Sequence, residues 1–162
     1  MNADVDVDPT DGRDETADER HDRNWNELLQ ELRVTQTGTQ IITGFLLTLP
    51  FQQRFTVLDA FELDVYLVLV VLAAISTVIG LAPVTLHRLL FRQRAKEEMV
   101  KVGNRILLTA IVVVGLVVSG VVLLIFDVVV SRQAGIIGGI IAIVLIAAVW
   151  LAIPTASRKD RN

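Results

Sequence analysis

Residues 106–126 read ILLTAIVVVGLVVSGVVLLIF, and this stretch decides the fold class because none of its 21 residues is Asp, Glu, Lys or Arg. About 20 residues of α-helix cross a hydrocarbon core of about 30 Å. A helix of a soluble bundle keeps a polar face for water, and this segment has none. A lone β-strand would leave its backbone unpaired in lipid, whereas a helix satisfies it internally. The segment therefore predicts a transmembrane helix.

Three further windows without acidic or basic residues accompany this one. They cover residues 34–53, 65–86 and 133–157. Together the four windows predict an all-α fold, an integral membrane four-helix bundle formed by residues 23–157. Residues 158–162 are expected to form a basic cytoplasmic end.

Charge is distributed unevenly along the chain. Residues 1–31 contain 11 of the 18 acidic residues and three of the 15 basic ones. Residues 1–22 are too poor in apolar side chains to form a core, so we expect a disordered, acidic cytoplasmic tail. A partner-binding acidic arm is the alternative. The acidic balance argues against a nucleic-acid partner, and the lack of cysteine excludes disulfides and Cys-ligated zinc.

The first window differs from the others because it contains five Thr and four Gln among its 20 residues. We expect one helix over about residues 24–49, ending at Pro50, whose polar face points into the bundle. This face carries Gln36, Thr37, Gln40, Thr43 and Thr48, and the opposite, lipid-facing stripe carries Val34, Ile41, Ile42, Phe45 and Leu49. The polar face has two interpretations, hydrogen bonding between helices or one wall of a polar pathway.

A second amphipathic segment precedes the third window. We expect the third helix to begin in water near Lys96, with Ala95, Met99, Val102 and Ile106 on one apolar face. That face would pack against Leu28, Leu29 and Leu32 of the first helix. The alternative is that both segments lie flat on the bilayer surface.

Basic residues predict the orientation. Thirteen of the 15 Lys and Arg residues lie in the N-terminal region, in residues 87–105 or at the C-terminus. Cytoplasmic loops carry the excess of Lys and Arg, so both termini are expected in the cytoplasm. The start of the chain lacks the pattern of a cleaved signal peptide.

Catalytic motifs and clusters of metal ligands are missing from the sequence, so we expect no enzyme activity, no cofactor and no metal. His87 and Asp127, both at membrane edges, are the candidate titrating groups, although each is more simply read as an interfacial residue. Arg54 is a possible ion-pair partner of Asp59. Small residues that favour close helix packing, within or between chains, are Gly115, Ser119, Gly135, Gly139 and Ala142.

Four segments carry a family resemblance. They are ELLQELRV (27–34), QTGTQI (36–41), FLLTLPFQQRF (45–55) and HRLLFR (87–92). They resemble a family of small bacterial four-span membrane proteins with a domain of unknown function, some of which carry a sodium:proton antiporter label. The resemblance covers about residues 25–155 and implies a location in the bacterial plasma membrane. It brings no established activity and no site residues.

Two functions are compatible with these observations. The first is a non-enzymatic accessory or interaction protein in the lipid bilayer, acting as a homo-oligomer or with another membrane protein. The alternative is a small ion or proton transporter, which would need Asp127 or His87 as the titrating group and Gln36, Gln40 and Thr43 as the path.

Overall fold

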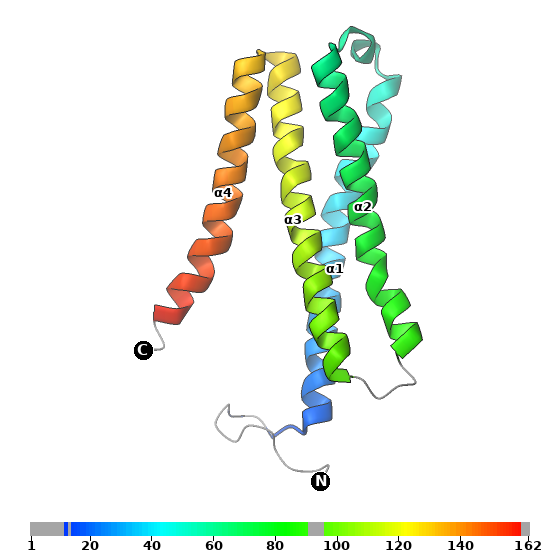
Figure 1. Ribbon diagram of the computed structural model, residues 1–162, viewed down its shortest axis with the longest axis vertical. Coiled ribbons are helices and arrows are strands. Elements are labelled where there is room, and N and C mark those ends of the chain that lie inside the picture. The colour runs from blue at the N-terminus through cyan, green and yellow to red at the C-terminus, as the bar shows by residue number, and fades with distance from the viewer. Residues whose placement is uncertain (1–11, 13, 91–95, 160–162) are drawn as a thin grey trace. The chain divides into compact units, whose positions relative to one another are not determined.

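The computed structural model describes residues 12, 14–90 and 96–159, and it describes the side chains of all of these except residues 84, 86–90, 96, 97 and 151–159. Within this part of the chain every regular element is helical, which confirms the all-α fold (Figure 1). The elements are α1 (Ala17–Thr48), the short 3-10 helices η1 (Leu49–Phe51) and η2 (Gln53–Val57), α2 (Ala60–Leu90), α3 (Lys96–Val129) and α4 (Arg132–Lys159).

The start of α1 is fixed by a capping box at Thr16 and Glu19. The Glu19 N–H donates to the Thr16 hydroxyl at 3.3 Å, and the Thr16 N–H donates to the Glu19 carboxylate at 2.9 Å. This reciprocal pair satisfies two backbone donors that a helix start leaves free. The expected disordered tail over residues 1–22 and the expected helix start near residue 24 are therefore wrong for residues 17–23. Residues 1–11 and 13 lie outside the described part of the chain.

Other helix boundaries match the expectations. α1 ends at Thr48, two residues before Pro50, which occupies the first turn of η1. α3 begins at Lys96, as the amphipathic pattern predicts. A second capping box starts α2, where the Glu62 N–H donates to the Asp59 carboxylate at 2.9 Å and the Asp59 N–H donates to the Glu62 carboxylate at 2.8 Å.

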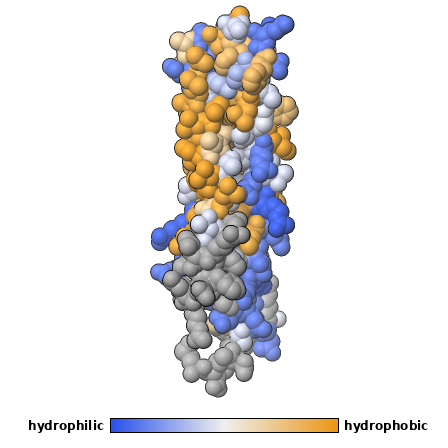
Figure 2. Space-filling model, turned by 90° about the vertical axis from the view of Figure 1, so that its right-hand side faces the viewer, coloured by the Kyte–Doolittle hydropathy of each residue, from blue (hydrophilic) through white to orange (hydrophobic). Residues whose placement is uncertain are grey.

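Three helices are long and apolar enough to cross a membrane. Their spans are Ala60–Pro83, Glu98–Val129 and Arg132–Trp150. In the described part of the chain, α1, which contains the first window, is not apolar enough to be counted among these helices. Within the α4 span only 11% is buried by the rest of the protein, against 28% for each of the other two. Figure 2 shows a large apolar surface beside a band of polar and intermediate surface. These helices thus leave most of their apolar surface for lipid or for other proteins.

The chain divides into two compact units. The first consists of Met1–Gly38 and Thr77–Ile111. Its core joins α1 to α3 through Leu28, Leu32, Leu107 and Ala110. An added Cβ on Gly103 would lie 2.9 Å from the Trp25 ring, so α3 approaches this side chain of α1 closely at the glycine.

The packing of this unit corrects one detail of the expected α1–α3 contact. α3 presents Gly103, Leu107 and Ala110, and not the neighbouring face of Met99, Val102 and Ile106, which is half-buried. The close approach at Gly103 explains the difference, because the large Trp25 ring fits only where α3 has no side chain. Ala95 lies outside the described residues. The two amphipathic segments therefore pack on each other through their apolar sides.

The second unit consists of Thr39–Ser76 and Val112–Asn162. Leu46 of α1, Tyr66, Leu69 and Ala73 of α2, and Leu124 of α3 form its core. The Tyr66 hydroxyl donates to the Leu46 carbonyl at 3.1 Å, so this buried polar group is satisfied. These contacts place the last ten residues of α1 beside the first half of the α2 span.

Candidate functional site: the Asp127–Arg132 cluster and the polar face of α1

A two-residue connection joins α3 to α4. The N–H groups of Val130 and Ser131 both donate to the Phe126 carbonyl, at 3.0 and 3.1 Å. The Ser131 hydroxyl then accepts a hydrogen bond from the Ala134 N–H at 3.3 Å and so caps α4. This tight turn brings Asp127, in the last turn of α3, close to Arg132, the first residue of α4.

Asp127 and Arg132 form an ion pair with 2.8 Å between Oδ2 of Asp127 and Nε of Arg132. The Asp127 side chain is only 3% exposed, whereas that of Arg132 is 38% exposed. A buried carboxylate without a partner is strongly destabilising, so Arg132 is the group that makes the burial of Asp127 possible. This geometry favours a structural role for Asp127 as the buried partner of Arg132.

Arg132 also connects the α3–α4 turn to the start of α2. Its guanidinium pairs with the Asp59 carboxylate, and the guanidinium carbon lies 4.0 Å from the centroid of the Phe61 ring. The suggested pairing of Asp59 with Arg54 is thus corrected, because Arg132 takes that place. We call Asp59, Phe61, Asp127 and Arg132 the arginine clamp.

Hydrogen bonds and a neighbouring positive charge lower the pKa of Asp59. The largest effect is the hydrogen bond that its carboxylate accepts from the Glu62 backbone N–H, and the next is the positive charge of Arg132. Asp59 therefore caps α2 and binds Arg132 through the same carboxylate. The sequence signal for the cap was the spacing of Asp59 and Glu62, which matches a capping box.

Small residues lie where α3 and α4 approach each other. An added Cβ on Gly135 would lie 2.7 Å from the Leu123 carbonyl oxygen and 2.8 Å from Cβ of Asp127. Gly139 approaches Cβ of Leu123 in the same way, at 3.0 Å. Three other small residues were predicted to favour close packing. Gly115 faces the Trp150 ring, and the Ser119 hydroxyl donates to the Gly115 carbonyl at 2.8 Å. Ala142 is half-buried. Gly115, Gly135 and Gly139 thus make contacts within one chain, and the glycine at 135 makes room for the clamp.

The polar face of α1 is turned differently from the expectation. Thr37, Gln40 and Thr48 are exposed, and Gln36 and Thr43 are half-buried. The buried side of α1 carries Trp25, Leu28, Leu32, Thr39 and Leu46. These positions follow one another at heptad-like spacings, so one side of α1 faces the local core in each of the two units.

Threonines tolerate this exposure because their hydroxyls are satisfied within the helix. Thr37 donates to the Arg33 carbonyl, Thr43 to that of Thr39 and Thr48 to that of Phe45, at 2.7–2.9 Å. Such back-bonding leaves no donor that needs a partner. The threonines therefore carry no argument for a polar pathway.

The two glutamines of this face differ. Gln36 lies against Gly80 of α2, where an added Cβ would be 2.8 Å from Gln36 Cγ. Gln40 is exposed, and its amide makes no hydrogen bond to any other described residue. Gln40 is thus the exposed glutamine of the candidate face, and its polar atoms are open to a partner outside the described part of the chain.

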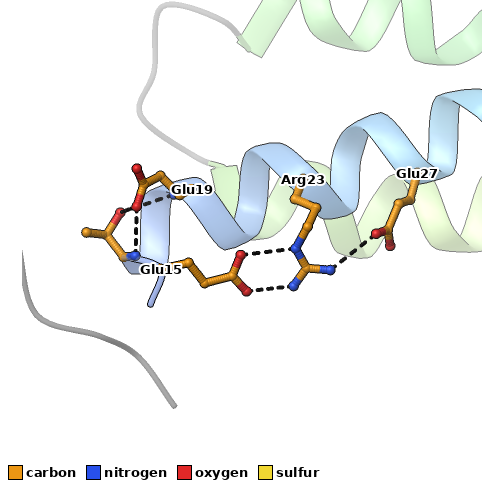
Figure 3. A network of polar contacts seen from close by, with 5 residues as sticks. Glu15, Glu19, Arg23 and Glu27 are labelled. Atoms are coloured by element: carbon orange, nitrogen blue, oxygen red, sulfur yellow. Dashed lines mark hydrogen bonds and ion pairs between the residues drawn. The ribbon is translucent and has the colours of Figure 1, made fainter. Parts of the chain in front are cut away.

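A second arginine-centred network lies near the start of α1 (Figure 3). Arg23 binds Glu15 through two hydrogen bonds of 2.6 and 3.0 Å and Glu27 through one of 3.2 Å. These carboxylates raise the pKa of Arg23, the Glu15 hydrogen bonds having the largest effect. This network was not predicted from the sequence, although Arg23 and Glu27 have the i,i+4 spacing of a helix ion pair.

His87 belongs to α2, but its side chain lies outside the described residues. Among the residues whose side chains are described, no group of three or more His, Cys, Asp or Glu is arranged to hold a metal ion. The candidate site thus consists of the arginine clamp and Gln40.

These observations define an all-α protein in which three helices have the length and composition of membrane spans. The sequence model of a family of unknown function, DUF6328, matches residues 14–154. The chain therefore belongs to this family, and the match begins just before the capping box of α1. No curated protein and no solved structure matches the chain.

Proposed function

We propose that the protein is a four-span integral membrane protein of the bacterial plasma membrane that acts without catalysis, as an accessory or interaction protein. One observation carries the proposal: the buried carboxylate near the end of the α3 span, Asp127, is held by Arg132 as part of a structural clamp. A group that carries a proton or ion must exchange its partner at membrane depth. Asp127 instead shares the guanidinium of Arg132 with Asp59. These contacts fix the end of α3 and the start of α4 to the start of α2.

The proposal includes α1 as the fourth span. Its last ten residues pack beside Tyr66, Leu69 and Ala73, which lie inside the α2 span. A helix at that depth shares the hydrocarbon layer with its neighbour, and its self-satisfied threonines make this possible. The bias of basic residues supports a cytoplasmic location of both termini.

Orientation can be tested by cysteine labelling, since the natural chain has no cysteine. Single cysteines at Lys96 and Asp160 are expected to react with an impermeant maleimide only after the cells are opened. A cysteine at Leu58, in the connection before α2, should react in intact cells. Labelling of positions 96 and 160 from outside would contradict the orientation.

The interaction role is tested by the mass of the particle extracted in small native nanodiscs. The proposal predicts a dimer or a stoichiometric complex with another membrane protein. A monomer at every concentration, together with no co-purifying protein, would contradict it.

A further inference from the structure

We infer that the exposed side of α1 around Gln40 is a docking surface for a second copy of this chain. This inference rests on the proposed function, because it assumes that α1 lies in the membrane. The surface consists of Gln40, Gly44 and Thr48, which recur every four residues and so follow one side of the helix. All three are exposed.

Depth is the first step of the argument. Leu46 of α1 contacts the first half of the α2 span, and its carbonyl accepts the Tyr66 hydroxyl. Gln40 lies six residues before Leu46, or about 9 Å further along the helix axis. Since α1 and α2 run in opposite directions, this displacement moves Gln40 towards the middle of the span Ala60–Pro83. The Gln40 amide is thus near the centre of the hydrocarbon layer.

An unpaired amide at that depth is unfavourable. Lipid tails neither donate nor accept hydrogen bonds, so an amide without a partner in an apolar medium is strongly unfavourable. The threonines on this side avoid the cost by bonding to their own helix, but no described group reaches the Gln40 amide. A polar partner from outside the chain removes the cost.

A second copy meets this requirement through symmetry. Two chains inserted in the same orientation and related by a two-fold axis along the membrane normal place identical residues opposite each other. A Gln side chain both donates and accepts, so each Gln40 amide N–H can donate to the Oε1 of the other. The two bonds are equivalent and leave one N–H on each side chain.

Gly44 allows the close approach that these bonds require. An added Cβ there meets no described atom within 4 Å, so its position on the helix is open. A small residue one turn from a polar residue lets two helix backbones approach in membranes. By contrast, the next exposed side of α1 carries Ile41 and Phe45, which suit lipid.

The test is disulfide crosslinking in native membranes, which needs no background removal in a cysteine-free chain. Gln40→Cys and Gly44→Cys are expected to form covalent dimers on mild oxidation. Phe45→Cys, on the same helix but 71% exposed on the lipid side, and Val71→Cys of α2 are the matched controls and are expected to stay monomeric. Equal crosslinking of Gln40→Cys and Phe45→Cys would overturn the inference.

A second measurement removes the hydrogen bond without adding a thiol. Gln40→Leu should raise the dimer dissociation constant in detergent roughly 10-fold, whereas Gln40→Asn, which keeps an amide, should stay within about 3-fold. Unchanged dimerisation of Gln40→Leu would overturn the inference. A stoichiometric complex with another protein, without crosslinking at position 40, would overturn it but leave the proposed function standing. A particle that is always monomeric and has no partner would overturn both.

Discussion

Arg23 and Arg132 each lie between two carboxylates, but the two networks differ in burial and reach. Arg23 joins Glu15 to Glu27 near the start of one helix, and the Glu27 side chain is 60% exposed. Arg132 joins Asp59 to Asp127, and the first of these contacts links residues 73 positions apart. The carboxylate of Asp127 is almost completely buried. An arginine between two carboxylates thus makes a local helix contact in one place and a tertiary clamp in the other.

The difference follows from what each arginine leaves behind when it is removed. Without Arg23, Glu27 is still reached by water, and Glu15, whose side chain is 13% exposed, is left less buried than Asp127. Ion pairs with such access to water contribute little to stability. Without Arg132, Asp127 remains in a site that water hardly reaches, and an uncompensated buried charge is costly. The contribution of each network to stability therefore depends less on the number of its ion pairs than on how deeply its most buried charged group lies.

The largest expected effect comes from comparing the two arginines directly. Arg132→Leu should lower the thermal unfolding midpoint in mild detergent by roughly 10 °C, because Asp127 loses its partner. Arg23→Leu should lower it by less than about 2 °C. The double variant Asp127→Leu with Arg132→Leu should recover most of the loss, since no buried charge remains. Equal effects of the two single variants would break the comparison.

The next largest effect is expected from a steric change at Gly135. Gly135→Ala should destabilise the protein by about 1–3 kcal/mol, because the new methyl group would press on the Leu123 carbonyl and on Asp127. Gly138→Ala on the same helix is the matched control, since its Cβ would lie 3.4 Å from the nearest atom, Cγ1 of Val122. We expect this control to be neutral or slightly stabilising, as Ala favours helix over Gly. Chemical denaturation measures both, and equal losses would argue against a tight fit at Gly135.

Acid should weaken the clamp at its exposed end. The pKa of Asp59 is lowered in the folded protein, so its stabilisation is complete above the ordinary value of 3.8 and is lost as the pH falls through the folded pKa. At pH 7, Asp59→Asn should therefore unfold about 2–3 °C below the unmodified protein. That difference should shrink as the pH falls from about 5 to 3. A gap that stays constant over this range would show that the charge of Asp59 is not involved.

The smallest effect is expected at the start of α1. Thr16→Ala removes the side-chain cap and should cost about 0.5–1 kcal/mol of local helix stability. Because the first turn can fray alone, faster amide hydrogen exchange should be confined to residues near Glu19, with the global unfolding midpoint unchanged. Thr37→Ala, whose hydroxyl only back-bonds to its own helix, serves as the control and should leave exchange near Glu19 unchanged. A large shift in the global midpoint would mean that the capping box does more than start the helix.

Helix positions were accessible from the sequence, because charge-free length, Pro50 and the amphipathic start near Lys96 are local signals. The rotation of α1 was not accessible, because threonine was expected to need an interhelical hydrogen-bond partner. Thr37 and Thr48 satisfy their hydroxyls within the helix, so polarity alone did not identify the buried side. Thr39 and Leu46 at heptad-like spacing from Leu32 were the better signal.

The candidate site was accessible only in part. Asp127 stood out as a carboxylate among valines, and Arg132 follows it closely in sequence. The contact with Asp59 could not be foreseen, since a pairing across 73 residues depends on which helix ends meet. Both capping boxes had a readable spacing, and the one at Thr16 was not predicted because residues 1–22 were expected to be disordered.

Proton flux in proteoliposomes, followed with a pH-sensitive dye, tests most directly whether Asp127 is a structural partner and not a carrier. The account predicts that the unmodified protein and Asp127→Asn both give the flux of protein-free liposomes under an imposed sodium or pH gradient. A gradient-driven flux in the unmodified protein that Asp127→Asn abolishes would contradict it.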